Sequence, residues 1–546
     1  MQNHQIDSHS SLKANKLILL FNAVLILLSC AQIVPLTGGD KDILPPKEVK
    51  SEPLNGSLFF DSKTIEIEFD EFIQLNNSAS QLIVSPLMEP APEVSVKGKK
   101  LVVKLLGNLK DSTTYSINFG NAITDITENN VFPNYKYVFS TGSYIDSLSY
   151  SGTVVDAFDV SKKDNIYVLL YDQLTDSVPL KELPRYVAIT DKDGAFSISN
   201  IAHGNYKFFA INDINGNYLF DLPNEEIAFK DEIIMLDSSR SNNIVYLFEE
   251  ENKLQFVVKS ENKKRGKVEV ILNLPTKNLT INPINKPINE AIENWSTIEK
   301  NKIGDSLTIW LAPPMLALEN ILLELKDGEE IIDTVDVTLL DKKKAKDSVI
   351  TITTNISGSF DLNKDIVLSL NSPFVSYLGD SIQLYEDNVL ITTSHFTATS
   401  LRKFELAYHF KENTNYQLFI PPATFTDIYG LQNDTLKVKF KTKKLADYGT
   451  ILLKVTTNFT ENYIVQLYKN KTLIKESTFK GASKIDYQYL LPGAYQLKLI
   501  IDNNEDTKWN TGNYLNHLQP EKVIFYEKDI LIKANWDNDI NWIIKE

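Results

Sequence analysis

Apolar residues along most of this chain alternate with polar ones, in short segments that turn residues separate. Clear examples are residues 64–69, 100–105, 254–258 and 436–440, in which β-branched and aromatic side chains are frequent. Alternation places the apolar side chains on one face of a strand, and turn signals roughly every 8–12 residues are typical of β-sandwiches. The pattern therefore predicts an all-β chain of tandem sandwiches.

The N-terminal segment has a different pattern, a continuous apolar run. Lys13 and Lys16 precede this run, and Cys30, the only cysteine of the chain, closes it. A basic segment followed by about a dozen apolar residues is typical of a secretory signal and is too short to cross a hydrocarbon core of about 30 Å. The end of the run, residues 27–30, resembles the bacterial lipobox, although Leu28 replaces the usual small residue. This resemblance implies that Cys30 is lipidated. An ordinary signal peptide with a chance cysteine is the alternative.

Composition narrows the function classes. Cleavage before Cys30 would leave 517 of the 546 residues, enough for several domains. It would also remove Asp7, Lys13 and Lys16, which changes the net charge from −15 to −16. An acidic surface repels phosphate backbones, so we expect no nucleic-acid partner. With Cys30 acylated no thiol remains, which excludes disulfides, thiolate metal sites and cysteine nucleophiles.

The chain contains an internal duplication. Three segments recur at an offset of 301 residues, namely 63–69 with 364–370, 110–117 with 411–418, and 139–141 with 440–442. A second pair, 204–217 and 493–506, recurs at an offset of 289. Fixed offsets indicate repeated structural units. The predicted order is a signal peptide (1–29), a lipid-anchored tether (30–46), module A (47–143), module B (144–240), an unduplicated sandwich-like module C (241–345), module A′ (346–444) and module B′ (445–546).

Motifs in module A resemble a known domain family. Residues 65–71 (IEIEFDE), 109–115 (LKDSTTY) and 122–126 (AITDI) occur in that order. They resemble the bacterial Ig-like domain named after the S-layer protein SbsA. Module A′ keeps Tyr416 and Asp427 but has lost the FDE segment, so it resembles a diverged copy. The resemblance implies an Ig-like sandwich.

Module B resembles a second family. A turn with Asp193 and Gly194 precedes Phe196, and the segment 204–206 (GNY) follows. This order resembles the carboxypeptidase regulatory-like, prealbumin-type β-sandwich, a module that is not itself catalytic. An Asp-Gly turn supplies the positive φ that a tight hairpin requires. Together, the motifs predict tandem Ig-like and prealbumin-like β-sandwiches behind a lipoprotein signal peptide.

The whole arrangement is similar to Ig-like-domain lipoproteins of the Bacteroidetes. That resemblance implies a lipid-anchored location at the outer membrane, with the leaflet left open. We expect a non-catalytic scaffold that contacts outer-membrane or surface proteins, and an accessory role in an assembly or export complex would fit. Glycan binding at the cell surface is the alternative. The sequence contains no nucleophile elbow, Walker loop or dinucleotide motif, so we do not expect an enzyme.

Two loops carry oxygen side chains at a spacing that suits Ca²⁺. Oxygen side chains at positions 1, 3, 5 and 9 of a loop, with a backbone carbonyl near position 7, are what Ca²⁺ takes from one loop, and the role of the ion would be structural. The alternative is a polar hairpin in which Asp and Asn side chains hydrogen-bond their own turn backbone. The candidate ligands are Asp213, Asn215, Asn217, Asp221 and Glu225 in module B, and Asp502, Asn504, Asp506 and Asn510 in module B′.

Tryptophan residues gather near the C-terminal end. Trp509, Trp536 and Trp542 lie within the last 38 residues. Exposed indole rings stack on sugars or anchor a protein interface, which makes the three residues candidates for ligand binding. Core packing is the alternative for each of them.

Overall fold

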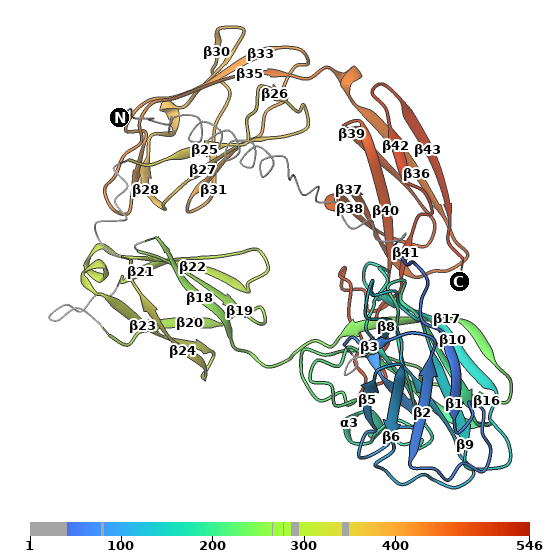
Figure 1. Ribbon diagram of the computed structural model, residues 1–546. Helices are drawn as coiled ribbons and strands as arrows, with labels where there is room; N and C mark the ends of the chain where they lie inside the picture. Colours follow the sequence, from blue (N-terminus) through green and yellow to red (C-terminus); the bar gives the residue numbers. More distant parts are fainter. Residues whose placement is uncertain are drawn as a thin grey trace, which may run out of the picture. The chain divides into compact units, whose positions relative to one another are not determined.

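The computed structural model describes residues 41–77, 81–264, 266–276, 278–285, 294–340 and 349–545 (Figure 1). Among these residues the only α-helix is the single turn α3 (Val178–Lys181), and strands dominate, which confirms the all-β prediction. The chain divides into two compact units, residues 1–147 and 148–546. Within the described residues, no helix is long and apolar enough to cross a membrane.

The first unit is an Ig-like sandwich. Its main sheet has the order β1-β2-β6-β5 and faces a sheet of order β4-β7-β9 and the pair β3-β8. Alternation in β2 sends Ile65, Ile67 and Phe69 into a core that includes Tyr137 and Phe139. The strands are β1 (Glu48–Glu52), β2 (Thr64–Phe69), β3 (Ile73–Leu75), β4 (Ile83–Ser85), β5 (Glu93–Lys97), β6 (Lys100–Lys104), β7 (Thr114–Asn118), β8 (Ile123–Asp125) and β9 (Lys136–Ser140).

Asp125 explains one motif of this sandwich. Its buried carboxylate accepts backbone N–H groups from Glu128, Asn129 and Asn130 at 2.7, 2.8 and 3.1 Å. Burial acts to raise the pKa of Asp125, but these hydrogen bonds outweigh it and hold the pKa below its ordinary value. Asp427 of module A′ holds the equivalent loop through N–H groups. The motif aspartate is therefore a loop cap.

The second unit begins with a sandwich whose strands run in the order β12-β11-β14-β15-β17-β10-β13, with β16 paired to β14. The predicted end of module B at residue 240 is wrong. Strand β17 starts there, pairs in parallel with β10, and buries Val245 and Leu247 in the same core, so module B extends to Glu249. The strands are β10 (Leu148–Asp156), β11 (Tyr167–Tyr171), β12 (Tyr186–Ile189), β13 (Ala195–Ile201), β14 (Gly204–Ile211), β15 (Glu226–Phe229), β16 (Ile234–Leu236) and β17 (Arg240–Glu249).

Module B′ repeats this topology at the end of the chain. Its sheets have the orders β38-β37-β40-β41 and β39-β36-β43, with β42 paired to β40. Strands β36 and β43 are parallel, as β10 and β17 are in module B. The strands are β36 (Gly449–Thr456), β37 (Asn462–Lys469), β38 (Thr472–Lys480), β39 (Ser483–Leu490), β40 (Gly493–Asp502), β41 (Val523–Phe525), β42 (Ile530–Ile532) and β43 (Asp537–Ile543).

Two further sandwiches, modules C and A′, lie between these copies in the sequence. Module C has the sheets β18-β19-β22-β21 and β20-β23-β24, and module A′ has β25-β27-β32-β31, β26-β35-β33-β29-β30 and β28-β34. The strands of module C are β18 (Val257–Lys264), β19 (Lys267–Leu272), β20 (Leu279–Pro283), β21 (Ser296–Lys300), β22 (Ser306–Leu311), β23 (Asn320–Asp327) and β24 (Glu330–Thr338). Those of module A′ are β25 (Ile352–Thr354), β26 (Ser359–Phe360), β27 (Ile366–Leu370), β28 (Phe374–Tyr377), β29 (Gln383–Glu386), β30 (Val389–Ile391), β31 (Thr397–Ser400), β32 (Lys403–Leu406), β33 (Asn415–Ile420), β34 (Phe425–Asp427) and β35 (Leu436–Thr442).

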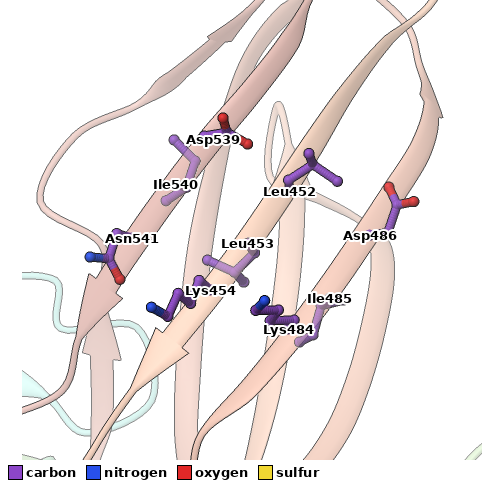
Figure 2. A pocket seen from close by; sticks show the side chains of 9 residues that line it. All are labelled: Leu452, Leu453, Lys454, Lys484, Ile485, Asp486, Asp539, Ile540 and Asn541. Carbon is purple, nitrogen blue, oxygen red and sulfur yellow. The ribbon is translucent and has the colours of Figure 1, made fainter.

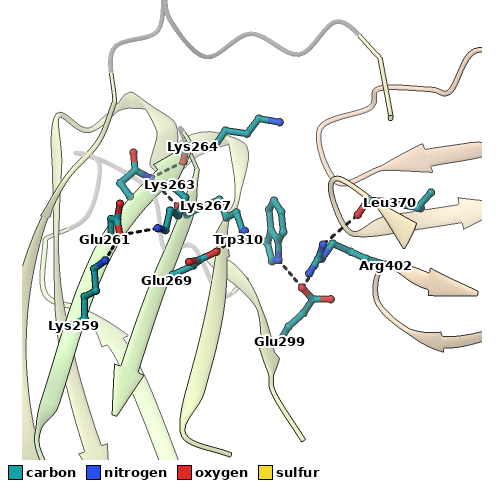
Figure 3. Close-up of polar contacts among 11 residues, drawn as sticks. Lys259, Glu261, Lys263, Lys264, Lys267, Glu269, Glu299, Trp310, Leu370 and Arg402 are labelled. Carbon is teal, nitrogen blue, oxygen red and sulfur yellow. Dashed lines mark hydrogen bonds and ion pairs between the residues drawn. The ribbon is translucent and has the colours of Figure 1, made fainter. Parts of the chain in front are cut away.

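A charged contact joins modules C and A′ (Figure 3). Nε of Arg402 donates to Oε2 of Glu299 at 2.6 Å, and the guanidinium lies 5.3 Å from the centre of the Trp310 ring. Nε1 of Trp310 donates to the same carboxylate oxygen at 3.1 Å. Arginine suits such a site because it can stack on an aromatic ring and pair with a carboxylate at once.

Candidate functional site

The predicted lipidation site lies outside the described residues. This holds for Cys30, for the signal peptide, and for residues 30–40 of the tether. Lipidation of Cys30 therefore stays a prediction.

The first candidate calcium loop satisfies its own polar groups. The carboxylate of Asp213 accepts N–H groups from residues 216–218, and Asp221 accepts the side-chain amides of Asn215 and Asn217 at 3.0 and 2.8 Å. Glu225 is buried and accepts three further backbone N–H groups. This network is the self-capped hairpin that the sequence left open as an alternative.

The loop of module B′ has a similar hydrogen-bond network, but one buried polar atom in it has no partner. Asp502 accepts the N–H groups of Asp506 and Thr507, and Glu521 accepts those of Asn503 and Asn510. Burial is the main reason why the pKa of Glu521 is raised, and the charges of Asp502 and Asp506 add to it. Oδ1 of Asn510 is buried and has no hydrogen-bond partner. A buried oxygen without a donor is unfavourable, so a ligand at this atom would stabilise the loop.

A calcium titration separates the two loops. Within the described chain, no three His, Cys, Asp or Glu side chains form a group that could hold a metal ion. That holds for both loops, and they differ in their hydrogen bonds: Asp221 in the first loop accepts the side-chain amides of the loop itself, whereas Oδ1 of Asn510 in the second has no partner. We expect calorimetry of EDTA-treated protein to show one Ca²⁺ site per chain, which is lost in Asn510→Ala and kept in Asn217→Ala. Absence of binding heat would contradict a calcium role.

The three tryptophans lie in three different environments. Trp542 is only 6% exposed and packs in the core against Tyr526. The alternative of core packing therefore holds for Trp542, whose ring has no face exposed for stacking on a ligand. Trp509 is half-buried, packs edge-on against Phe158 and donates its Nε1–H to the carbonyl of Glu521. Trp536 is 58% exposed. Only Trp536 keeps the exposed ring that the ligand-binding prediction requires.

Residues 503–522, which we call the clasp loop, join β40 to β41 and pack on module B. Tyr514 is 2% exposed and inserts edge-on between Phe209 and Phe229, with ring centres 5.2 and 5.0 Å away. Gly512 lies so close to the ring of Phe248 that an added Cβ would approach a ring carbon to 2.5 Å. The clasp loop therefore holds modules B and B′ together although two modules separate them in the sequence.

Polar and charged contacts surround this aromatic contact. The Tyr514 hydroxyl donates to the carbonyl of Asp176, and Gln519 donates to the carbonyl of Phe229 at 3.2 Å. Lys498 is buried over the ring of Phe158. Burial lowers the pKa of Lys498 to about 8, although nearby aspartates act in the opposite direction. Sequence reasoning missed these residues because no motif marks a contact between distant segments.

The exposed face of the sheet β39-β36-β43 carries a hollow (Figure 2). A cavity of about 430 Å³ lies over the middle of the three strands, and a second of about 410 Å³ adjoins it toward Trp536. Both include Leu452 and Asp486 in their walls. We call the two together the sheet-face groove. Its other outward side chains are Lys454, Lys484, Gln488, Tyr489, Asp537, Asp539 and Asn541.

Comparisons with known proteins support the Ig-like character of the first unit. A family model described as a bacterial Ig-like domain matches residues 42–141. No curated protein matches the chain.

Solved structures also match the chain, at low identity. The surface-layer protein SbsC (domains 1–6) shares 12% identity, covers 89% of this chain and 68% of its own, and has a TM-score of 0.15. The major pilin subunit BcpA of Bacillus cereus shares 10% identity, covers 73% and 98%, and has a TM-score of 0.14. Titin domains A168–A170 share 9% identity, cover 52% and 97%, and have a TM-score of 0.15. Superpositions this limited carry no argument about function.

Proposed function

We propose that this chain is a non-catalytic lipoprotein of the cell envelope that acts as a structural and protein-interaction scaffold. The observation that carries the proposal is the series of sandwiches. In these sandwiches the buried carboxylates of Asp125, Glu225 and Glu521 accept hydrogen bonds from backbone N–H groups. Such carboxylates hold loops in place and are not free to transfer protons. The chain therefore presents sheet faces and loops to partners.

Acylation of Cys30 supplies the attachment in this proposal. Two or three acyl chains hold a protein firmly on a membrane, where a single chain would bind reversibly. We place the protein at the outer membrane, on a leaflet that protease treatment of intact cells would identify. A specific role as an accessory subunit of an assembly or export complex fits such an anchored scaffold.

Cross-linking tests the scaffold role. Membranes of cells that express the tagged chain are treated with formaldehyde, and the chain is purified under denaturing conditions. We expect a stoichiometric partner from the outer membrane or cell surface, absent from an untagged strain. Repeated recovery of the chain alone would contradict the scaffold role.

The alternative function, capture of a glycan at the envelope, is favoured by one observation. Trp536 keeps its ring exposed, and Tyr489, which is 37% exposed, lines the same hollow. Two exposed aromatic rings in one hollow are unusual for a surface with a purely structural role.

A further inference from the structure

The sheet-face groove has the dimensions of a ligand site. Cavities of about 410 and 430 Å³ that share walls fall in the size range of small-ligand pockets, roughly 300–1,000 Å³. Residues that alternate along β36 and β43 face outward in register, since Leu452 pairs with Asp539 and Lys454 with Asn541. The groove therefore follows the strands and suits an extended ligand.

Tyr489 enters this groove through a strained backbone. Its φ is +59°, which is rare for a bulky side chain, and the pairing of β39 with β36 shifts register beside it. Gln488 and Tyr489 are both exposed in consequence, whereas Tyr487 and Leu490 point into the core. A bulge that redirects a side chain at the expense of strain is typical of functional sites.

Module B provides an internal comparison for this bulge. Asn200 occupies the position equivalent to Tyr489, 289 residues earlier, with the same φ of +59° and a similar register shift. Asparagine tolerates this conformation much better than tyrosine does. Ser199 of module B is equivalent to Gln488 of module B′. Ser239, the residue before β17, is equivalent to Trp536, the residue before β43. The rings and the longer polar side chains are therefore specific to module B′.

Most charged groups of the groove are available to a ligand. Asp537, Asp539, Lys454 and Lys484 form no ion pair within the described residues. Gln488 donates to Asp486 at 2.6 Å, and Oδ1 of Asn541 accepts from the Thr456 hydroxyl at 3.4 Å. The groove thus mixes donors and acceptors and carries charges of both signs. Such a surface suits a ligand with many hydroxyl groups, because each hydroxyl both donates and accepts.

We propose that the sheet-face groove binds an oligosaccharide segment of a glycan. The rings of Trp536 and Tyr489 stack on sugar faces at one end, and Asp, Asn, Gln and Lys side chains bind hydroxyl groups along the strands. Nζ of Lys533 lies over the Trp536 ring, 4.6 Å from its centre, within the range of a cation–π interaction. The proposal rests on glycan capture, the alternative function, and is independent of the scaffold role.

Affinity electrophoresis tests the groove. The full chain is run in native gels that contain β-glucan, xylan, mannan, dextran or soluble chitin oligomers, and calorimetry measures any binding. We expect at least one glycan to retard the protein and Trp536→Ala to weaken that binding about tenfold or more. Tyr489→Asn, which installs the residue of module B, should weaken binding without lowering the melting temperature, because it relieves the strain at positive φ.

The control is Tyr246→Ala. Tyr246 is also 37% exposed, and it lies on β17, the strand of module B equivalent to β43. This variant should bind as the wild type does. Retardation by none of the glycans, or equal binding by Trp536→Ala and wild type, would overturn the proposal. So would a photo-cross-linker at position 489 that captures a protein in cells. None of these results depends on the formaldehyde cross-linking experiment, so glycan binding and the scaffold role can each be contradicted without the other.

Discussion

Replacing Tyr514 by alanine is expected to detach the clasp loop from module B. The side chain is 2% exposed between Phe209 and Phe229, and its hydroxyl donates to the carbonyl of Asp176. Truncating a buried aromatic residue costs about 3–5 kcal/mol, because it removes apolar contacts and leaves a cavity. Here the loss falls on the contact between modules B and B′, so each sandwich should stay folded while the contact opens.

Hydrogen exchange measures this opening. A loss of about 3 kcal/mol or more raises the exchange rate of amides protected by docking by a factor of about 100 or more. We expect the change in residues 503–522 and in the facing strand β15, with β36 and β43 unaffected. Leu515→Ala is the control, since Leu515 lies in the same loop and is 67% exposed. Unchanged exchange in Tyr514→Ala would show that the clasp loop does not hold the modules together.

The strands could be predicted from sequence because their information is local. Residues 64–69 alternate, and the structure buries Ile65, Ile67 and Phe69 as alternation requires. The fixed offset of 289 residues likewise pointed to the recurrence of one topology in modules B and B′. The boundary at residue 240 was misplaced because β17 pairs with β10, about 90 residues earlier, and no local signal marks that pairing.

The site could be predicted only in part, for the same reason. Trp536 and Trp542 are alike in sequence, but Trp536 follows a turn and is exposed, whereas Trp542 lies within β43 and points into the core. The clasp loop contacts residues such as Glu250, more than 260 positions away. Tyr489 would have been expected inside the sandwich by alternation, and only the bulge turns it outward.

Acylation at Cys30 is the central claim, and Cys30→Ala tests it most directly. Wild-type chain should sediment with membranes, dissolve only in detergent, and be heavier than residues 30–546 alone by the mass of its acyl groups. Without a sulfur atom to acylate, Cys30→Ala should leave the mature membrane-bound pool completely, because the acyl chains are the proposed membrane anchor. If Cys30→Ala still fractionated with membranes, or if the wild-type chain carried no added mass, the account of an anchored scaffold would be contradicted.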